Sequence, residues 1–184
     1  LVEQSIAKIF EDCPIDLAII LDMPPAVGFE RMKAAGKALD TMEQMPLEAV
    51  IGRCRVFEME CEDQITADDL KKLKLMPGQR VLFKTRNSTR SWGMQEFDKH
   101  FVSIRQDAAQ YLVEQKVMTV GVDYLSIGGY EKDGVETHQI MLGAGMWVIE
   151  GLNLTDIKPG YYELICLPLK IEGADGAPCR VVLR

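Results

Sequence analysis

The sequence predicts an α/β domain, with helices packed on a mixed or barrel-like core of strands. Three observations support this class. Strand-like and helix-like segments alternate from Ile51 onward, the expected helix starts carry capping residues, and the chain closes with two β-rich segments joined by a glycine-rich turn. A length of 184 residues suits one core, so we expect a single domain over residues 1–184.

The first half of the pattern contains two strands and the helix between them. IGRCRVFEME, residues 51–60, is rich in β-compatible residues. A helix should begin near Thr66, because Thr66 and Asp69 have the spacing of a capping box. This helix should end near Pro77, before RVLFKT, residues 80–85, which reads as a short apolar strand.

A second helix and a third strand follow. The polar stretch RNSTRSWGMQEF, residues 86–97, is too hydrophilic for a core element and predicts a loop. Ser103 and Gln106 form a second capping box, which predicts a helix starting near Ser103. The strand VMTVGVD, residues 117–123, comes after that helix and completes an order that builds a sheet with helices packed on it.

The last third predicts a short helix, an apolar run and a terminal hairpin. The helix is expected in THQIMLGAG, residues 137–145, and MWVIE, residues 146–150, is the apolar run. Two strands, residues 161–171 and 179–184, should form the hairpin and turn between Gly173 and Gly176.

Composition and charge exclude several classes of function. The 21 Lys and Arg against 28 Asp and Glu give a net charge of −7, which offers no general attraction to nucleic acid or to anionic membranes. No apolar run approaches the roughly 18 residues that a membrane-spanning helix needs, and acidic residues occupy the start, where a secretion signal would be apolar. We therefore expect a cytoplasmic protein with no nucleic-acid or membrane partner.

The cysteines predict reduced thiols. There are five, an odd number, and no two have C-x-x-C spacing. Small buried side chains are the simplest interpretation of all five. They are Cys13, Cys54, Cys61, Cys166 and Cys179.

Only two histidines are present, so a histidine-based site must use one of them. His100 precedes the second expected helix and reads as an exposed loop residue. His138 lies in the short helix, and twelve residues later Glu150 ends the apolar run. A carboxylate there needs a cation, a donor or a metal, and imidazole with carboxylate suits zinc or manganese. A loop histidine and a salt-bridged glutamate remain the alternative.

A substrate pocket is the second candidate site. Asp123 ends a strand that we expect to be parallel, where α/β sheets usually bind ligands, and Ser126 follows closely. The alternative is an aspartate that stabilises the next turn. The pair Gly128-Gly129 lacks the G-x-G-x-x-G pattern, so a dinucleotide site is not indicated.

From about Gly36 to Arg184, four fifths of the chain, the sequence resembles the cyclase family of metal-dependent hydrolases, which includes bacterial kynurenine formamidase and isatin hydrolase. The segments that carry the resemblance are GKALDTMEQMPLEAVIGRCRVFE, ITADDL, GQRVLFKT, VGVDYLSIGG, THQIMLGAGMWVIEGLNL and, most specifically, GYYELICLPLKIEGADGAPCRVVL.

The resemblance implies a swivelling β/β/α fold and one or two divalent metals, commonly zinc or manganese, that activate water to cleave amides or lactams. His138 and Glu150 stand where the family has two metal ligands twelve residues apart, so we expect them to lie close together. A homodimer or homotetramer is also implied.

One departure from the family is large. Relatives carry a motif of the type H-x-G-T-H-x-D-x-P-x-H before the G-x-x-L-D-x-x-P-L-E stretch, with three more ligands and a catalytic histidine. Here DMPPAVG stands in that place and holds no histidine, so no catalytic residue is assigned. Either a stretch between about residues 13 and 31 is absent from this sequence, which predicts a break in the backbone between Cys13 and Arg31, or the protein itself lacks the motif.

The expected function is metal-dependent hydrolysis of a small amide. An N-formyl aromatic amide, as in the formamidase reaction, and a cyclic amide, as in isatin hydrolysis, are the substrates that the resemblance implies. The alternative is a family relative without catalysis that acts as a binding or scaffold protein.

Overall fold

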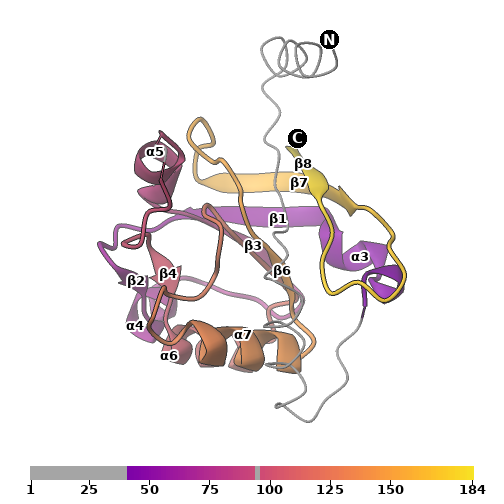
Figure 1. Ribbon diagram of the computed structural model, residues 1–184, viewed down its shortest axis with the longest axis horizontal. Coiled ribbons are helices and arrows are strands. Elements are labelled where there is room, and N and C mark those ends of the chain that lie inside the picture. Colours follow the sequence, from indigo (N-terminus) through magenta and orange to yellow (C-terminus); the bar gives the residue numbers. More distant parts are fainter. Residues whose placement is uncertain (1–40, 94–95) are drawn as a thin grey trace.

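The structure of the protein is a computed structural model that describes residues 41–93 and 96–184. It has the α/β architecture that the sequence predicts (Figure 1). The elements in chain order are η1 (Met42–Gln44), α3 (Leu47–Val50), β1 (Ile51–Glu58), β2 (Gln64–Ile65), α4 (Ala67–Lys71), β3 (Arg80–Lys84), α5 (Asn87–Arg90), η2 (Ser91–Gly93), β4 (Ser103–Ile104), α6 (Gln106–Glu114), β5 (Thr119–Val122), α7 (Gly134–Gly143), β6 (Trp147–Ile149), β7 (Gly160–Pro168) and β8 (Cys179–Leu183).

Six strands form one mixed sheet in the order β6-β5-β3-β1-β7-β8. β6, β5, β3 and β1 are parallel neighbours. β7 runs antiparallel to both β1 and β8. β2 and β4 pair separately as a short parallel ladder. The sheet curls into a half-barrel, which confirms the expected mixed, barrel-like strand core (Figure 1).

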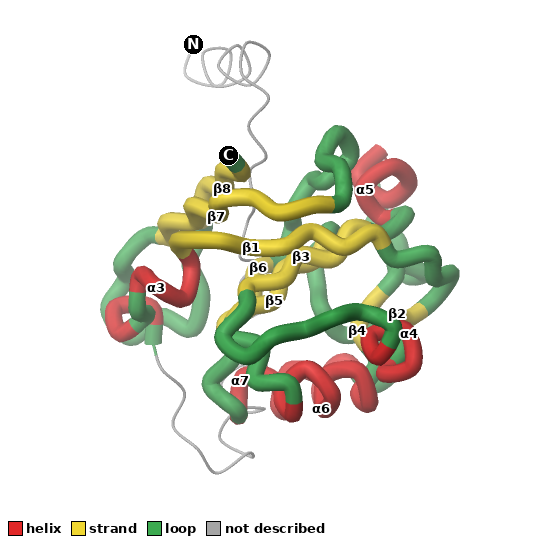
Figure 2. Tube along the Cα trace, turned by 180° about the vertical axis from the view of Figure 1, so that it is seen from behind, coloured by secondary structure: helices red, strands yellow, loops and turns green. Residues whose placement is uncertain are grey.

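Each face of the sheet carries its own hydrophobic core. Helices α4, α6 and α7 lie along one side of the molecule and cover the face that includes Val81 and Phe83 of β3 (Figures 1 and 2). The opposite face, which includes Leu82, packs against α3 and against Leu152 and Leu154 of the segment after β6. The alternating side chains of β3 therefore contribute to both cores, as expected of a strand covered on both faces.

The first predicted helix start is confirmed. The Thr66 hydroxyl accepts a hydrogen bond from the Asp69 N–H at 3.3 Å, and Asp69 Oδ2 accepts one from the Thr66 N–H at 3.1 Å. This is the reciprocal capping box that the spacing indicates. The helix is shorter than expected, because α4 ends at Lys71, well before Pro77.

The second predicted helix is present, but the capping box that predicted its start is wrong. Ser103 lies in β4, where it pairs with Gln64 of β2, and α6 begins at Gln106. The Gln106 N–H donates instead to Asp133 Oδ2 at 2.6 Å. A residue 27 positions away thus supplies the cap, so local spacing alone misplaces this helix start.

The polar stretch after β3 is also not a simple loop. It forms α5 and η2 and buries the side chains of Asn87, Ser88 and Ser91. The prediction of a hydrophilic loop was wrong, because hydrogen bonds satisfy these side chains inside the molecule.

The terminal hairpin is confirmed. β7 and β8 pair antiparallel, and Gly173 in the turn has φ of +70°, a conformation that favours glycine. The break expected between Cys13 and Arg31 lies outside the described residues.

Candidate functional site

The candidate site lies at the carboxyl ends of three adjacent parallel strands. Thr85 follows β3, Asp123 follows β5 and Glu150 follows β6. Because these strands are parallel neighbours, the three residues lie at one edge of the sheet. Open α/β sheets bind ligands at this edge.

His138 and Glu150 lie close together, as expected. His138 projects from α7, and its Nε2 atom is 3.3 Å from Oε1 of Glu150. Their side chains are 18% and 10% exposed, respectively. Within the part of the chain that the structure describes, Glu150 pairs with this histidine rather than with a lysine or arginine.

Backbone groups orient both side chains. The carbonyl of Gly134, one turn earlier in α7, contacts Nδ1 of His138 at 2.5 Å. The N–H of Ile127 donates to Oε1 of Glu150 at 2.7 Å. The loop between β5 and α7 therefore holds the carboxylate, and α7 holds the imidazole.

These contacts favour a proton or a metal ion between the two side chains. A carbonyl only accepts, so the contact with Gly134 places a proton on Nδ1 of His138. Nε2 then faces the carboxylate oxygen of Glu150 either as a second N–H, which makes the ring an imidazolium, or as a bare lone pair. Two facing lone pairs repel, so either a proton or a metal ion must lie between them.

The pair fits two ligands of a zinc-type ion. Two ligand atoms in a tetrahedral site with bonds of about 2.0–2.1 Å are separated by about 3.3 Å, which matches the observed distance. A backbone carbonyl that holds the second ring nitrogen is also typical of metal-binding histidine. Stable zinc sites use three or four protein ligands. Within residues 41–93 and 96–184, no group of three or more His, Cys, Asp or Glu side chains is arranged to hold a metal.

Asp123 is buried and fully engaged with its own chain. Its Oδ2 atom accepts from the Thr85 N–H at 2.6 Å, the Ser88 N–H at 3.1 Å and the Ser88 hydroxyl at 2.8 Å. Its Oδ1 atom accepts from the Thr85 hydroxyl at 2.9 Å and from the Asn87 amide at 3.3 Å. Burial raises the pKa of Asp123, and these donors partly offset that effect. The geometry shows an anchor for the segment after β3, while the substrate-pocket role of Asp123 stays a prediction.

Ser126 has a local partner. Its hydroxyl contacts the carbonyl oxygen of Gly128 at 3.0 Å and accepts from the Gly128 N–H at 3.2 Å. These contacts shape the turn that delivers the Ile127 N–H to Glu150. The predicted contact of Ser126 with substrate likewise stays a prediction.

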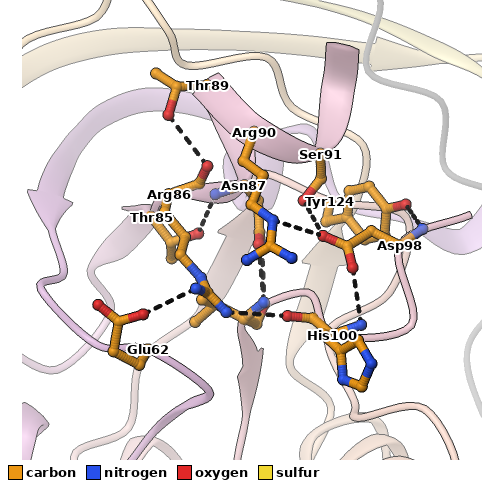
Figure 3. Close-up of polar contacts among 11 residues, drawn as sticks. Glu62, Thr85, Arg86, Asn87, Thr89, Arg90, Ser91, Asp98, His100 and Tyr124 are labelled. Atoms are coloured by element: carbon orange, nitrogen blue, oxygen red, sulfur yellow. Dashed lines mark hydrogen bonds and ion pairs between the residues drawn. The ribbon is translucent and has the colours of Figure 1, made fainter. Parts of the chain in front are cut away.

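A second buried aspartate fixes the segment that carries His100 (Figure 3). Asp98 accepts from the Ser91 hydroxyl and the His100 N–H, both at 2.9 Å, and lies 3.6 Å from Arg90. Burial acts to raise the pKa of Asp98, but these partners hold it below its ordinary value. His100 itself is exposed, as predicted.

Aromatic side chains gather beside this segment. The ring of Tyr124, directly after Asp123, contacts those of Trp92, Phe97 and Phe101. The Trp92 N–H is shared between the carbonyls of Asp123 and Leu152, at 3.1 and 3.0 Å. In the sequence, aromatic residues are frequent between positions 92 and 130. This frequency alone does not indicate that their side chains contact one another.

The N–H of Ile127 is a further site group that sequence reasoning missed. A backbone group carries no residue-type signal, so only the neighbouring glycine pair marks the turn.

No helix of the described residues combines the length and apolar character needed to cross a membrane.

Comparisons with known proteins agree with this architecture. A family model described as "Putative cyclase" matches residues 21–128. Cyclase-like protein 3 of Oryza sativa subsp. japonica is 37% identical over 164 residues, which cover 86% of this chain and 59% of that protein. Kynurenine formamidase of Paracidovorax citrulli is 31% identical over 191 residues, which cover 99% of this chain and 86% of that enzyme.

Solved structures share the fold. A potential metal-dependent hydrolase with cyclase activity superposes with a TM-score of 0.73 at 34% identity, covering 92% of this chain and 76% of the other. Isatin hydrolase A from Ralstonia solanacearum, at 20% identity, has a TM-score of 0.70 over 92% of this chain and 70% of its own, and this shows a common fold. The chain spans about three fifths of the length of the first plant relatives that it matches. By its family match, its sequence identity and its structure, this chain belongs to the cyclase family.

Proposed function

We propose that the protein is a metal-dependent hydrolase of small amides, with His138 and Glu150 as two of its metal ligands. The facing pair carries this proposal, because its distance of 3.3 Å suits a metal ion held between imidazole and carboxylate. Membership of a family with formamidase relatives supports the reaction class. The substrate is an N-formyl aromatic amide or a cyclic amide.

The residues of this chain orient the metal site. The Gly134 carbonyl fixes the ring of His138 so that Nε2 points at Glu150, and the Ile127 N–H fixes the Glu150 carboxylate. At His138 and Glu150, zinc or manganese would lower the pKa of a bound water and would polarise the amide carbonyl.

The test measures metal content and hydrolysis together. Protein expressed from its native gene, loaded with zinc or manganese, is assayed on N-formylkynurenine and isatin. We expect His138→Ala and Glu150→Gln to lose both bound metal and activity, while His100→Ala, which changes an exposed histidine, keeps both. If the loaded protein hydrolyses neither amide, the alternative of a non-catalytic binding or scaffold protein is preferred.

We also propose a homodimer or homotetramer. Tyr161, Leu167 and Val182 lie exposed on the β7–β8 hairpin, at the edge of the sheet. Apolar side chains at an exposed sheet edge favour association. Sedimentation that shows only monomer at micromolar concentration would contradict this.

A cytoplasmic location is proposed as well. None of the four cysteines in the described part of the chain forms a disulfide, as is typical of a reducing compartment. Localisation of a tagged full-length protein in its own cell tests this.

A further inference from the structure

Two buried cysteines of the terminal hairpin lie close enough to react with each other. The Sγ atoms of Cys166 on β7 and Cys179 on β8 are 3.5 Å apart, and the pair is reduced in this structure. The antiparallel register places Cys166 opposite Val181 and Cys179 opposite Pro168, so the two cysteines are diagonal neighbours on the hairpin. An S–S bond is about 2.05 Å long, so the two sulfurs need to approach by only about 1.5 Å.

The contact between the two sulfurs has a direction. The Cys166 S–H donates to the Cys179 sulfur, and this hydrogen bond, together with burial, raises the pKa of Cys166. Cys166 therefore keeps its proton, and the negative charge of a thiolate is stabilised on Cys179, the acceptor. The thiolate is the form of cysteine that attacks an oxidant. Cys179 is thus the first sulfur to react, and Cys166 lies beside it as the second thiol.

Cys179 is also the sulfur that an oxidant can reach. It is 5% exposed and begins β8, the edge strand of the sheet, whereas Cys166 is fully buried (Figure 1). The Pro178 carbonyl accepts from the Leu169 N–H, but a proline has no N–H to donate in return, so the strand pairing is weaker at this end. Segments with fewer hydrogen bonds open locally at a lower cost in free energy. A small oxidant therefore reaches Cys179 before Cys166.

We propose that Cys166 and Cys179 are a redox modification site, at which a peroxide forms a reversible disulfide between β7 and β8. With hydrogen peroxide, the Cys179 sulfur attacks one oxygen, the O–O bond breaks, and the products are a sulfenic acid on Cys179 and one water. The Cys166 sulfur then attacks the Cys179 sulfur and displaces hydroxide, which takes the Cys166 proton and leaves as a second water. The two sulfurs together lose two electrons, and the peroxide gains them. This inference does not depend on the proposed hydrolase function.

The strand geometry makes this disulfide easy to reduce. Diagonal neighbours on antiparallel strands lie about 7–8 Å apart, whereas the Cα atoms of a relaxed disulfide are usually about 4.4–6.8 Å apart. The bond must therefore draw the two strands together locally, and a disulfide formed in this way is more readily reduced. Labile disulfides of this kind are typical of thiols that sense oxidants in a reducing compartment.

Peptide mapping of the oxidised full chain tests the proposal. Reduced protein is treated with hydrogen peroxide, the remaining thiols are blocked, and trypsin digestion follows without a reductant. Cleavage after Lys170 and Arg180 separates the two cysteines, so the disulfide would join two peptides and lower their summed mass by two hydrogens. Incubation with reduced glutathione before digestion should restore both thiols.

Single variants test the order of the two steps. In Cys166→Ala, the sulfenic acid on Cys179 has lost its second thiol, so dimedone, a reagent for sulfenic acids, should label Cys179. In Cys179→Ala, Cys166 should stay unmodified. Cys54→Ala is the matched control, because Cys54 is a buried thiol of the same hydrophobic core, and its removal should leave the disulfide yield unchanged. Circular dichroism confirms the folding of each variant, and the mapping of the wild type needs no substitution.

Three results would overturn the proposal. If peroxide oxidises the half-buried Cys61 while Cys166 and Cys179 remain thiols, the pair is only a part of the core. A disulfide that joins either cysteine of the pair to a different partner excludes the paired site. A bond between Cys166 and Cys179 that reduced glutathione does not break would be a permanent cross-link instead of a reversible modification.

Discussion

Replacement of Asp123 tests the anchor that joins the ends of β3 and β5. Five hydrogen bonds from three residues converge on this carboxylate, which is fully buried. In Asp123→Ala, the N–H groups of Thr85 and Ser88 and the amide of Asn87 would lose a buried acceptor. Each such loss costs about 1–3 kcal/mol, or about 3–9 kcal/mol together. That is comparable to the total stability of a typical domain, about 5–15 kcal/mol.

Asp123→Asn is the informative variant because it keeps the side-chain volume. Its single carbonyl oxygen can replace Oδ2, which accepts three of the five bonds, while its NH₂ group would face the Asn87 amide, another donor. We expect the free energy of unfolding to fall by about 2–3 kcal/mol, within the range for leaving a buried hydrogen-bonding group without its partner. Urea denaturation followed by circular dichroism measures it.

Asp68→Asn serves as the control. Asp68 pairs with Lys71 on the surface, and its side chain is 83% exposed, so its loss should cost only about 0–0.5 kcal/mol. If the free energy of unfolding of Asp123→Asn lies within about 0.5 kcal/mol of the wild-type value, the five hydrogen bonds do not anchor this edge of the sheet.

The pH dependence of stability has a definite sign. Because burial raises the pKa of Asp123, the folded state keeps this proton to higher pH than the unfolded state. This group therefore lowers the free energy of unfolding as pH rises above about 4, the pKa of an unfolded aspartate. Asp123→Asn should remove that slope.

Three further predictions follow from local geometry. A Cβ atom on Gly128 would lie 2.4 Å from the Gly134 Cα and 2.6 Å from its carbonyl oxygen, so Gly128→Ala should weaken zinc binding in calorimetry, whereas Gly143→Ala, with open space around it, should not. Hydrogen bonds from its capping box lower the pKa of Asp69 to about 2. The difference in free energy of unfolding between wild type and Asp69→Asn should therefore be largest above pH 4 and disappear as the pH falls toward 2. A difference that stays constant with pH would contradict this. Burial raises the pKa of Cys54 to about 11, so iodoacetamide at neutral pH should modify it, as detected by mass spectrometry, only after unfolding.

The fold was largely predictable because its strands and most helix ends have local causes. The Thr66 capping box and the Gly173 turn are each encoded within a few residues, and both are confirmed. The start of α6 was not predictable, since Asp133 reaches it from a distant loop. Strand order was not predictable for the same reason, because β7 pairs with β1 although about a hundred residues separate them.

The candidate site divides in the same way. His138 and Glu150 could be selected because imidazole and carboxylate have recognisable chemistry, and the structure places them together. The buried role of Asn87 and Ser88 could not be selected, because hydrophilic residues indicate solvent unless their partner is known. That partner, Asp123, lies more than thirty residues away.

The shared hydrogen of the Trp92 indole gives the protein an internal optical reporter. One N–H spans two backbone carbonyls, one after β5 and one just beyond Glu150, so a small separation of these segments must break or lengthen a contact of the chromophore. Indole emission shifts with the polarity of its surroundings. The second tryptophan, Trp147, can be replaced by phenylalanine to leave a single emitter. In that variant, the emission maximum would report movement of the segments after β5 and β6 in real time, with no added label.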